Sequence, residues 1–432
     1  MISRFWKSKP KDSPSEGFKE GPSTYDVGTT TATKLLDKTL AGGATAERRE
    51  LFQPEVEALD VAPPPPPQGF AVYQHFYPLP MVTGDMVLVT GDVPAPSSAL
   101  LDRLIASYRS EMEQAQRASG VWTTITGHKQ DVHETLLAGD KDKLAKLLTD
   151  PAQSMLLHGF DQPTANSIKN LHTPGMLILH RGLILGSLRR LAEGIGALPM
   201  AYPEGYGQTG DIVSNDAVDS DDIIKAIEAE IGQTLTFPNP FQNEIGVDTK
   251  RGVLTYRSVQ SLFQGWRLAA LANGAAEKDK SLSALEIGGG TGRTAYFSYM
   301  SGVHDYTIVD LPLTGIVQSY FLASALGEDR VVMAGEPFRE DAVKIISPPA
   351  LKERPFTVVA SFDALVEFSR EAAADYLDYA VRNADVFCSI NRESKPYRVR
   401  DLLQERNLVS TRTPYWLRNG YAEEVAILKP TK

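Results

Sequence analysis

One segment, residues 284–313 with the sequence ALEIGGGTGRTAYFSYMSGVHDYTIVDLPL, constrains the fold of this chain most strongly. It predicts a strand over 284–287, a glycine turn, the start of a helix over 293–300 and a second strand over 306–309. The backbone of such a turn can approach a ligand closely because glycine has no Cβ. Asp310 ends the second strand, so we expect its carboxylate to reach two ribose hydroxyls of a nucleoside lying across the strand ends.

The spacing of the glycines indicates which nucleoside cofactor fits. A dinucleotide fingerprint reads G-x-G-x-x-G and seats a pyrophosphate on a helix N-terminus. Here Gly288, Gly290 and Gly292 read G-x-G-x-G, and Glu286 precedes them. An acid before the turn suits a cofactor that has an ammonium group and no phosphates, and S-adenosylmethionine is such a cofactor. The alternative is a tight turn in another α/β sheet, which the spacing of the two acids disfavours.

The run E-I-G-G-G-T-G followed by I-V-D-L-P resembles motif I and the following acidic strand of class I S-adenosylmethionine-dependent methyltransferases. Within that class it resembles most the bacterial proteins classed as sugar O-methyltransferases. The resemblance covers residues 250–432 well, 120–250 loosely and the first 68 not at all. It implies a Rossmann-like, mostly parallel sheet with an antiparallel last strand. It also implies a set of cofactor contacts, namely Glu286, Gly288, Gly290, Gly292 and Asp310.

Strand and helix patterns continue to alternate after Asp310. They predict helices over 315–326, 371–383 and 401–406, strands over 331–334, 356–360 and 386–390, and at most a short helical turn over 342–346. The last residues predict a hairpin whose turn is Asn419-Gly420. Alternating strands and helices imply an α/β fold with a mostly parallel sheet and right-handed crossovers.

The chain before this domain divides into two regions. Residues 1–68 are rich in polar residues and proline and predict a disordered or extended tail, with one short helix over 46–52. Residues 69–250 predict a mainly helical accessory region that caps the substrate, and the methyltransferase domain follows over 251–432. In the accessory region we expect short strands over 69–93 and helices over 97–119, 133–137, 141–148, 163–171, 175–195 and 219–231.

The composition limits the possible binding partners and the cellular compartment of the protein. The net charge of −10 disfavours a broad nucleic-acid-binding surface. With Cys388 alone, neither an intrachain disulfide nor a zinc site of several cysteines can form. The first residues lack the apolar stretch of a secretory signal, and charges interrupt the most apolar helical stretch, 176–191. We expect a cytoplasmic protein with a small sugar-containing substrate and no membrane span; a homo-oligomer is compatible with the sequence.

Methyl transfer to a hydroxyl requires alignment of the acceptor oxygen and removal of its proton. Candidate groups follow the fourth and fifth strands, where ligands of open α/β sheets bind. Asp363, Asn391 and Glu393 are the predicted catalytic residues. They could hold Mg²⁺, with Asp363 as a ligand, or supply a base with hydrogen-bonding partners. In the structural alternative Asp363 caps a helix and Glu393 is solvated.

Other side chains extend the predicted site. We expect Leu311, Ser361, Phe362 and Arg257 to contact the cofactor as well; Arg257 could pair with its carboxylate, or lie on the surface. A base could also come from the helical region, from His128, His133 or His158. In the loop TFPNPFQNEIG, residues 236–246, amides beside aromatic rings suit either sugar recognition or an ordinary turn.

Four functions remain open at this point. The first is an O-methyltransferase acting on a sugar or a glycosylated metabolite. The second keeps the cofactor but has a phenolic or polyketide acceptor. The third is a nicotinamide-dependent oxidoreductase, which the G-x-G-x-G spacing disfavours. The fourth is a binding module that retains the fold without catalysis.

Overall fold

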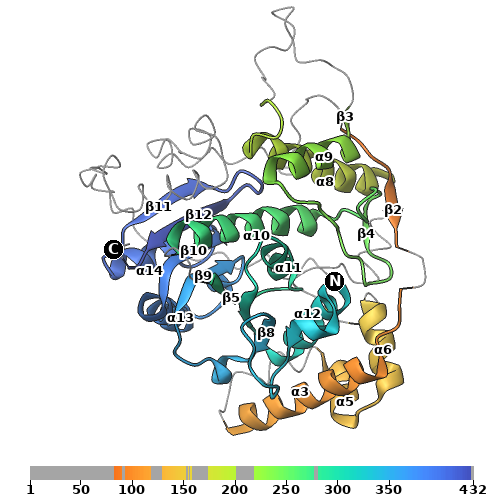
Figure 1. Cartoon of the computed structure of the whole chain (residues 1–432), viewed down its shortest axis with the longest axis vertical. Helices are drawn as coiled ribbons and strands as arrows, with labels where there is room; N and C mark the ends of the chain where they lie inside the picture. Colours follow the sequence, from red (N-terminus) through yellow and green to blue (C-terminus); the bar gives the residue numbers. More distant parts are fainter. Residues whose placement is uncertain are drawn as a thin grey trace, which may run out of the picture.

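The computed structural model describes residues 82–89, 93–117, 129–151, 154, 156–157, 174–200, 218–276 and 281–429 (Figure 1). The predicted tail, the predicted helices over 46–52 and 163–171, and His128 and His158 lie outside these residues. Within them, no helix is long and apolar enough to cross a membrane.

An eight-stranded sheet lies at the centre of the described structure, in the order β11-β12-β10-β9-β5-β6-β8-β7. Neighbouring strands are parallel except β12, which is antiparallel to both β10 and β11. This arrangement confirms the predicted Rossmann-like sheet, which is mostly parallel with an antiparallel last strand. Its strands are β5 (Ser283–Ile287), β6 (Asp305–Val309), β7 (Val331–Val332), β8 (Val343–Ile346), β9 (Phe356–Phe362), β10 (Ala384–Arg392), β11 (Ser410–Pro414) and β12 (Tyr421–Ile427).

The prediction of a helical turn over 342–346 is wrong, because this segment forms β8 and pairs in parallel with β6. Val343 and Ile345 are buried in the core, whereas the charged Lys344 between them obscured the strand pattern in the sequence. The ammonium group of Lys344 is itself buried, and it forms an ion pair with Asp305 on β6. The pairing of β8 with β6 also positions Asp310, since the backbone N–H of Asp310 donates to the carbonyl of Ile346 at 3.1 Å.

Helices cover both faces of the sheet (Figure 1). Successive side chains of a strand point to opposite faces, so Ala284 of β5 joins one core cluster and Leu285 joins the other. The first cluster includes α10 (Tyr256–Ala275), α11 (Arg293–Met300) and α12 (Pro312–Leu326). The second includes α13 (Arg370–Asn383) and α14 (Val399–Glu405). Three short 3₁₀ turns complete the domain, at Glu328–Arg330, Pro348–Ala350 and Leu365–Glu367.

The described parts of residues 82–247 add most of their buried side chains to the first cluster, and Ile245 forms a small cluster of its own with Met86 and Leu88. Their helices are α3 (Ser98–Arg117), α5 (Gln130–Ala138), α6 (Lys141–Thr149), α8 (Pro174–Gly194) and α9 (Ser220–Ile231). Their strands are β1 (Val82–Thr83), β2 (Met86–Leu88), β3 (Val218–Asp219) and β4 (Ile245–Val247). α3 packs against α12, and α8 packs against α10 (Figure 1).

Arg103 of α3 binds the chain at the edge of the sheet. Arg103 donates to the Glu336 carboxylate and to the backbone carbonyls of Glu328 and Val331, at 2.7–2.9 Å. α3 begins at the predicted place, because the hydroxyl of Ser97 accepts a hydrogen bond from the N–H of Leu100. The accessory region is thus anchored on the same face of the sheet as α10 and α12.

Candidate active site

A cavity of about 270 Å³ opens where the strands β5, β6, β9 and β10 end. Ligands of open α/β sheets bind in this position, outside the carboxyl ends of the strands. Of the predicted site residues, those that line it are Glu286, Gly288, Gly290, Asp310, Leu311, Phe362, Asp363 and Arg257. Those that do not are Gly292, Ser361, Asn391 and Glu393.

The glycine turn requires glycine for its backbone conformation. Gly288, Gly290 and Gly292 have φ values of 76°, 56° and 90°, in the left-handed region that other residues rarely adopt. Gly288 is also restricted in space, because a Cβ there would lie 2.4 Å from the Cβ of Ala364. Gly292 precedes α11 as its N-cap residue. The turn therefore presents bare backbone to the cavity at the end of β5.

Glu286 lies beneath this turn and is 1% exposed. The hydroxyl of Tyr306 donates a hydrogen bond of 3.0 Å to its carboxyl group. Burial raises the pKa of Glu286 to about 8, and the nearby Asp310 carboxylate adds to the rise. A cation entering the cavity would favour the charged form of Glu286. An acid buried in this way fits an ammonium group of a ligand.

Asp310 is held at the end of β6 by two donors. Its Oδ1 accepts from the N–H of Leu311 at 2.7 Å, and its Oδ2 accepts from the side-chain amide of Gln318 at 2.8 Å. The same amide nitrogen donates to the carbonyl of Gly290 at 3.0 Å. Gln318 therefore ties the acid to the glycine turn. Burial raises the pKa of Asp310 to about 6, against the hydrogen bonds and the charge of Lys129.

Gln318 was missed by the sequence analysis. A signal was present, since Gln318 is a long polar residue within the apolar run GIVQSYFLASAL of α12, and it is fully buried. Its Oε1 has no hydrogen-bond partner among the described residues. Gln318 itself does not line the cavity, so it acts on the site through Asp310 and Gly290.

Asp363 follows β9 and serves as the counterion of two arginines. Its Oδ2 lies 2.5 Å from Nη1 of Arg418 and 3.6 Å from Nη1 of Arg257. Its backbone is left-handed, with φ of 56°, and its N–H donates to the carbonyl of Ile390. Such a conformation is costly for a residue other than glycine and is concentrated at functional sites. Arg418, from the connection between β11 and β12, was not predicted.

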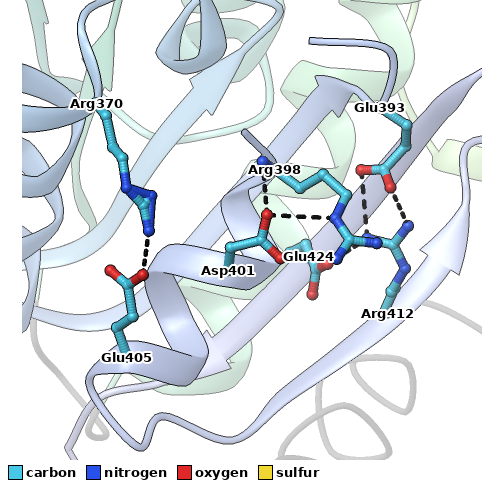
Figure 2. Close-up of polar contacts among 7 residues, drawn as sticks. All are labelled: Arg370, Glu393, Arg398, Asp401, Glu405, Arg412 and Glu424. Carbon is cyan, nitrogen blue, oxygen red and sulfur yellow. Dashed lines mark hydrogen bonds and ion pairs between the residues drawn. The ribbon is translucent and has the colours of Figure 1, made fainter. Parts of the chain in front are cut away.

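Asn391 and Glu393 do not join Asp363. The amide of Asn391 donates to the backbone carbonyl of Ser361 at 3.1 Å, within the sheet. Glu393 lies beyond the end of β10, where its carboxylate binds Arg412, which also binds Glu424 (Figure 2). The expected convergence of three side chains does not occur, because Asn391 binds the backbone of β9 and Glu393 binds Arg412 of β11. The described residues contain no group of three or more acidic, histidine or cysteine side chains that could hold a metal ion.

Two other predicted residues have structural roles in the described chain. Ser361 is fully buried; its hydroxyl donates to the carbonyl of Ile287 and accepts from the N–H of Leu365, which joins β9 to β5 and to the following turn. His133 shares a hydrogen bond of 2.6 Å with the hydroxyl of Tyr108, between α5 and α3, and does not line the cavity.

The loop of residues 236–246 is held by contacts with the segments that follow it in the chain. The side chain of Asn239 both donates to the carbonyl and accepts from the N–H of Val253, which agrees with an ordinary turn. Glu244 of this loop is fully buried and lies 2.5 Å from the guanidinium of Arg293, the first residue of α11. The loop is thus attached to the helix that follows the glycine turn.

No protein-family model matches the chain, and no curated protein matches it. Solved structures that resemble part of it include the O-methyltransferase family 2 protein of Planctomyces limnophilus in complex with apigenin (11% identity, 40% of this chain and 60% of that one, TM-score 0.30). Another is the magnesium protoporphyrin IX methyltransferase of Synechocystis with bound SAH (12% identity, 40% of this chain and 87% of that one, TM-score 0.29). A third is the N-terminal domain of human METTL16 with SAH (10% identity, 48% of this chain and 81% of that one, TM-score 0.32).

Proposed function

We propose that this chain is an S-adenosylmethionine-dependent methyltransferase. The observation that carries the proposal is the placement of Glu286 and Asp310 on either side of a left-handed glycine turn, at the ends of the neighbouring strands β5 and β6. Neighbouring strands lie about 4.8 Å apart, so a nucleoside with an amino-acid tail can span both acids. Asp310 and Leu311 would hold the adenosine, and Glu286 would bind the ammonium group.

The same residues disfavour a nicotinamide cofactor. Its pyrophosphate would lie on the glycine turn, above Glu286. Glu286 is 1% exposed, and its carboxyl group accepts a hydrogen bond from the neutral hydroxyl of Tyr306. A phosphate there would face a buried acid, whereas an ammonium group would find a partner.

For the acceptor, we propose a hydroxyl of a sugar or a glycosylated metabolite. The cavity is lined by amide and hydroxyl side chains, including Gln260, Ser261 and Gln264, which suit hydrogen bonding to several hydroxyl groups. Asp363 is proposed to accept the proton from the reacting hydroxyl, because its carboxylate lines the cavity at the end of β9. Arg418 and Arg257 would keep that carboxylate in position.

Calorimetry tests whether the cofactor binds. Mass spectrometric detection of a methylated product tests whether the chain catalyses the transfer. We expect S-adenosylhomocysteine to bind with micromolar affinity, on the order of −7 to −8 kcal/mol. Binding of NAD without binding of S-adenosylhomocysteine would contradict the proposal. A panel of sugar and phenolic acceptors, incubated with the cofactor, should give a singly methylated product among the sugars; methylation of phenols alone would select the second acceptor class.

A further inference from the structure

The far wall of the cavity, on the side of β10 and β12, is built by the connection between β11 and β12. This connection brings Tyr415 and Arg418 to the cavity, β12 contributes its first residue, Tyr421, and α10 contributes Arg257. In the sheet order, β9 and β10 separate this connection from β5. A cofactor spanning the ends of β6 and β5 would leave this side for the methyl acceptor. This place for the acceptor rests on the proposed function.

Positive charge exceeds negative charge at this wall. The guanidinium groups of Arg418 and Arg257 share one carboxylate, Asp363. The other acid on this side, Glu367, has its own partner in Lys395, at 2.8 Å. Arginine remains charged at neutral pH, so one positive charge is left without a matching negative charge among these groups.

Arg418 is held in a fixed orientation at the cavity wall. Its guanidinium carbon lies 4.0 Å from the centroid of the Tyr421 ring, a cation–π contact. One end of the guanidinium group, Nη1, donates to Asp363 at 2.5 Å. Since a guanidinium has five N–H donors in a planar fork, the contact with Asp363 leaves donors for a ligand oxygen.

Tyr415 provides an independent indication of a ligand oxygen. Its side chain is 3% exposed and lines the cavity, yet its hydroxyl has no hydrogen-bond partner among the described residues. Buried hydroxyl groups are nearly always paired, because leaving one unpaired costs free energy. An acceptor oxygen of a ligand would satisfy it.

We propose that the methyl acceptor is an anion, whose carboxylate or phosphate group binds Arg418 and the hydroxyl of Tyr415. Asp363 then has a second role, since it orients the arginine fork that receives this group. The chemistry of the site is shared by acidic sugars and phosphorylated sugars, and the geometry of a guanidinium suits both groups.

The test uses the full chain loaded with S-adenosylhomocysteine, so that any position for the cofactor's own carboxylate is already filled. Calorimetric titrations compare glucuronate and glucose 6-phosphate with neutral glucose. We expect at least one of the anions to bind about 10-fold or more tightly than glucose, a difference of about 1.4 kcal/mol. Comparison of glucuronate with glucose 6-phosphate shows whether the site prefers a carboxylate or a phosphate group.

Three variants test whether Arg418 and Tyr415 cause the preference for an anion over glucose. Arg418→Gln should abolish the preference for the anion, Arg418→Lys should retain part of it, and Tyr415→Phe should reduce it. All three should bind S-adenosylhomocysteine within a few-fold of wild type, which shows that they are folded. Arg370→Gln is the matched control, because Arg370 forms an exposed ion pair with Glu405 and does not line the cavity (Figure 2).

Three results would overturn the inference: glucose binding as tightly as both anions, no anion binding at millimolar concentration, or a preference that survives Arg418→Gln. Each leaves the proposed function standing as long as S-adenosylhomocysteine binds. Failure of the wild-type chain to bind S-adenosylhomocysteine would instead reject the proposed function itself.

Discussion

Tyr306 on β6 donates a hydrogen bond of 3.0 Å to Glu286 on the neighbouring strand β5, and both side chains are buried. Burial raises the pKa of Glu286 to about 8 from an ordinary value of 4.5. Between these two pH values the folded protein holds a proton that the unfolded chain releases. The stability contributed by Glu286 is therefore present in full below about pH 4.5 and is lost as the pH rises through 8.

Cofactor binding should release a proton from Glu286. At pH 7 the empty protein holds most of this proton, whereas an ammonium group favours the carboxylate. We expect S-adenosylhomocysteine to bind more tightly as the pH rises from 6 to 8, with release of close to one proton at pH 7. Calorimetry in buffers of different ionisation enthalpy measures that release. In Glu286→Gln, binding should weaken and the release should disappear; an unchanged release would show that another group titrates.

Removal of the Asp310 carboxylate should weaken cofactor binding without unfolding the chain. Each charge-assisted hydrogen bond to a ribose hydroxyl contributes roughly 1.5–3 kcal/mol, so Asp310→Ala should lower the affinity by at least 10-fold. Gln318→Leu removes only the group that ties Asp310 to the turn, and its effect should be smaller. Titration calorimetry of both variants provides the check, and equal affinities for Asp310→Ala and wild type would contradict this role.

Asp363→Asn should separate chemistry from cofactor binding. We expect turnover to fall by about 10²-fold or more, because an amide cannot accept the proton, while cofactor affinity changes only a few-fold. Glu405→Gln is the control and should keep wild-type turnover, because Glu405 forms an exposed ion pair and does not line the cavity. EDTA should leave turnover unchanged, since the described residues offer Asp363 no set of acidic or histidine partners for a metal. Full activity in Asp363→Asn would move the search to another base.

The buried ion pair between Arg267 on α10 and Glu423 on β12 predicts a stability effect separate from the site. The two charged groups lie 2.8 Å apart, with side chains 5% and 10% exposed. Arg267→Met leaves a buried carboxylate without its main partner, so the free energy of unfolding should fall by about 3–5 kcal/mol. Adding Glu423→Gln should recover part of that loss. Urea unfolding of the single and double variants measures both, and a purely additive double variant would argue against coupling.

Local patterns in the sequence were sufficient for much of the fold. The alternation of apolar strands with amphipathic helices, and the Asn419-Gly420 turn, predicted the parallel sheet and its antiparallel hairpin. β8 was missed because a strand buried on both faces is normally apolar throughout, and Lys344 breaks that pattern. Only the pairing with Asp305 on a neighbouring strand makes a lysine acceptable there.

The sequence by itself determined the proposed cofactor end of the cavity, because the glycine turn and the acids Glu286 and Asp310 belong to one strand–turn–helix–strand unit whose geometry is local. Tertiary structure alone decided the proposed acceptor end. Arg418 and Asp363 are 55 residues apart and come together only when the sheet closes in its final order. Residue spacing cannot show such a contact, since it depends on which strands become neighbours.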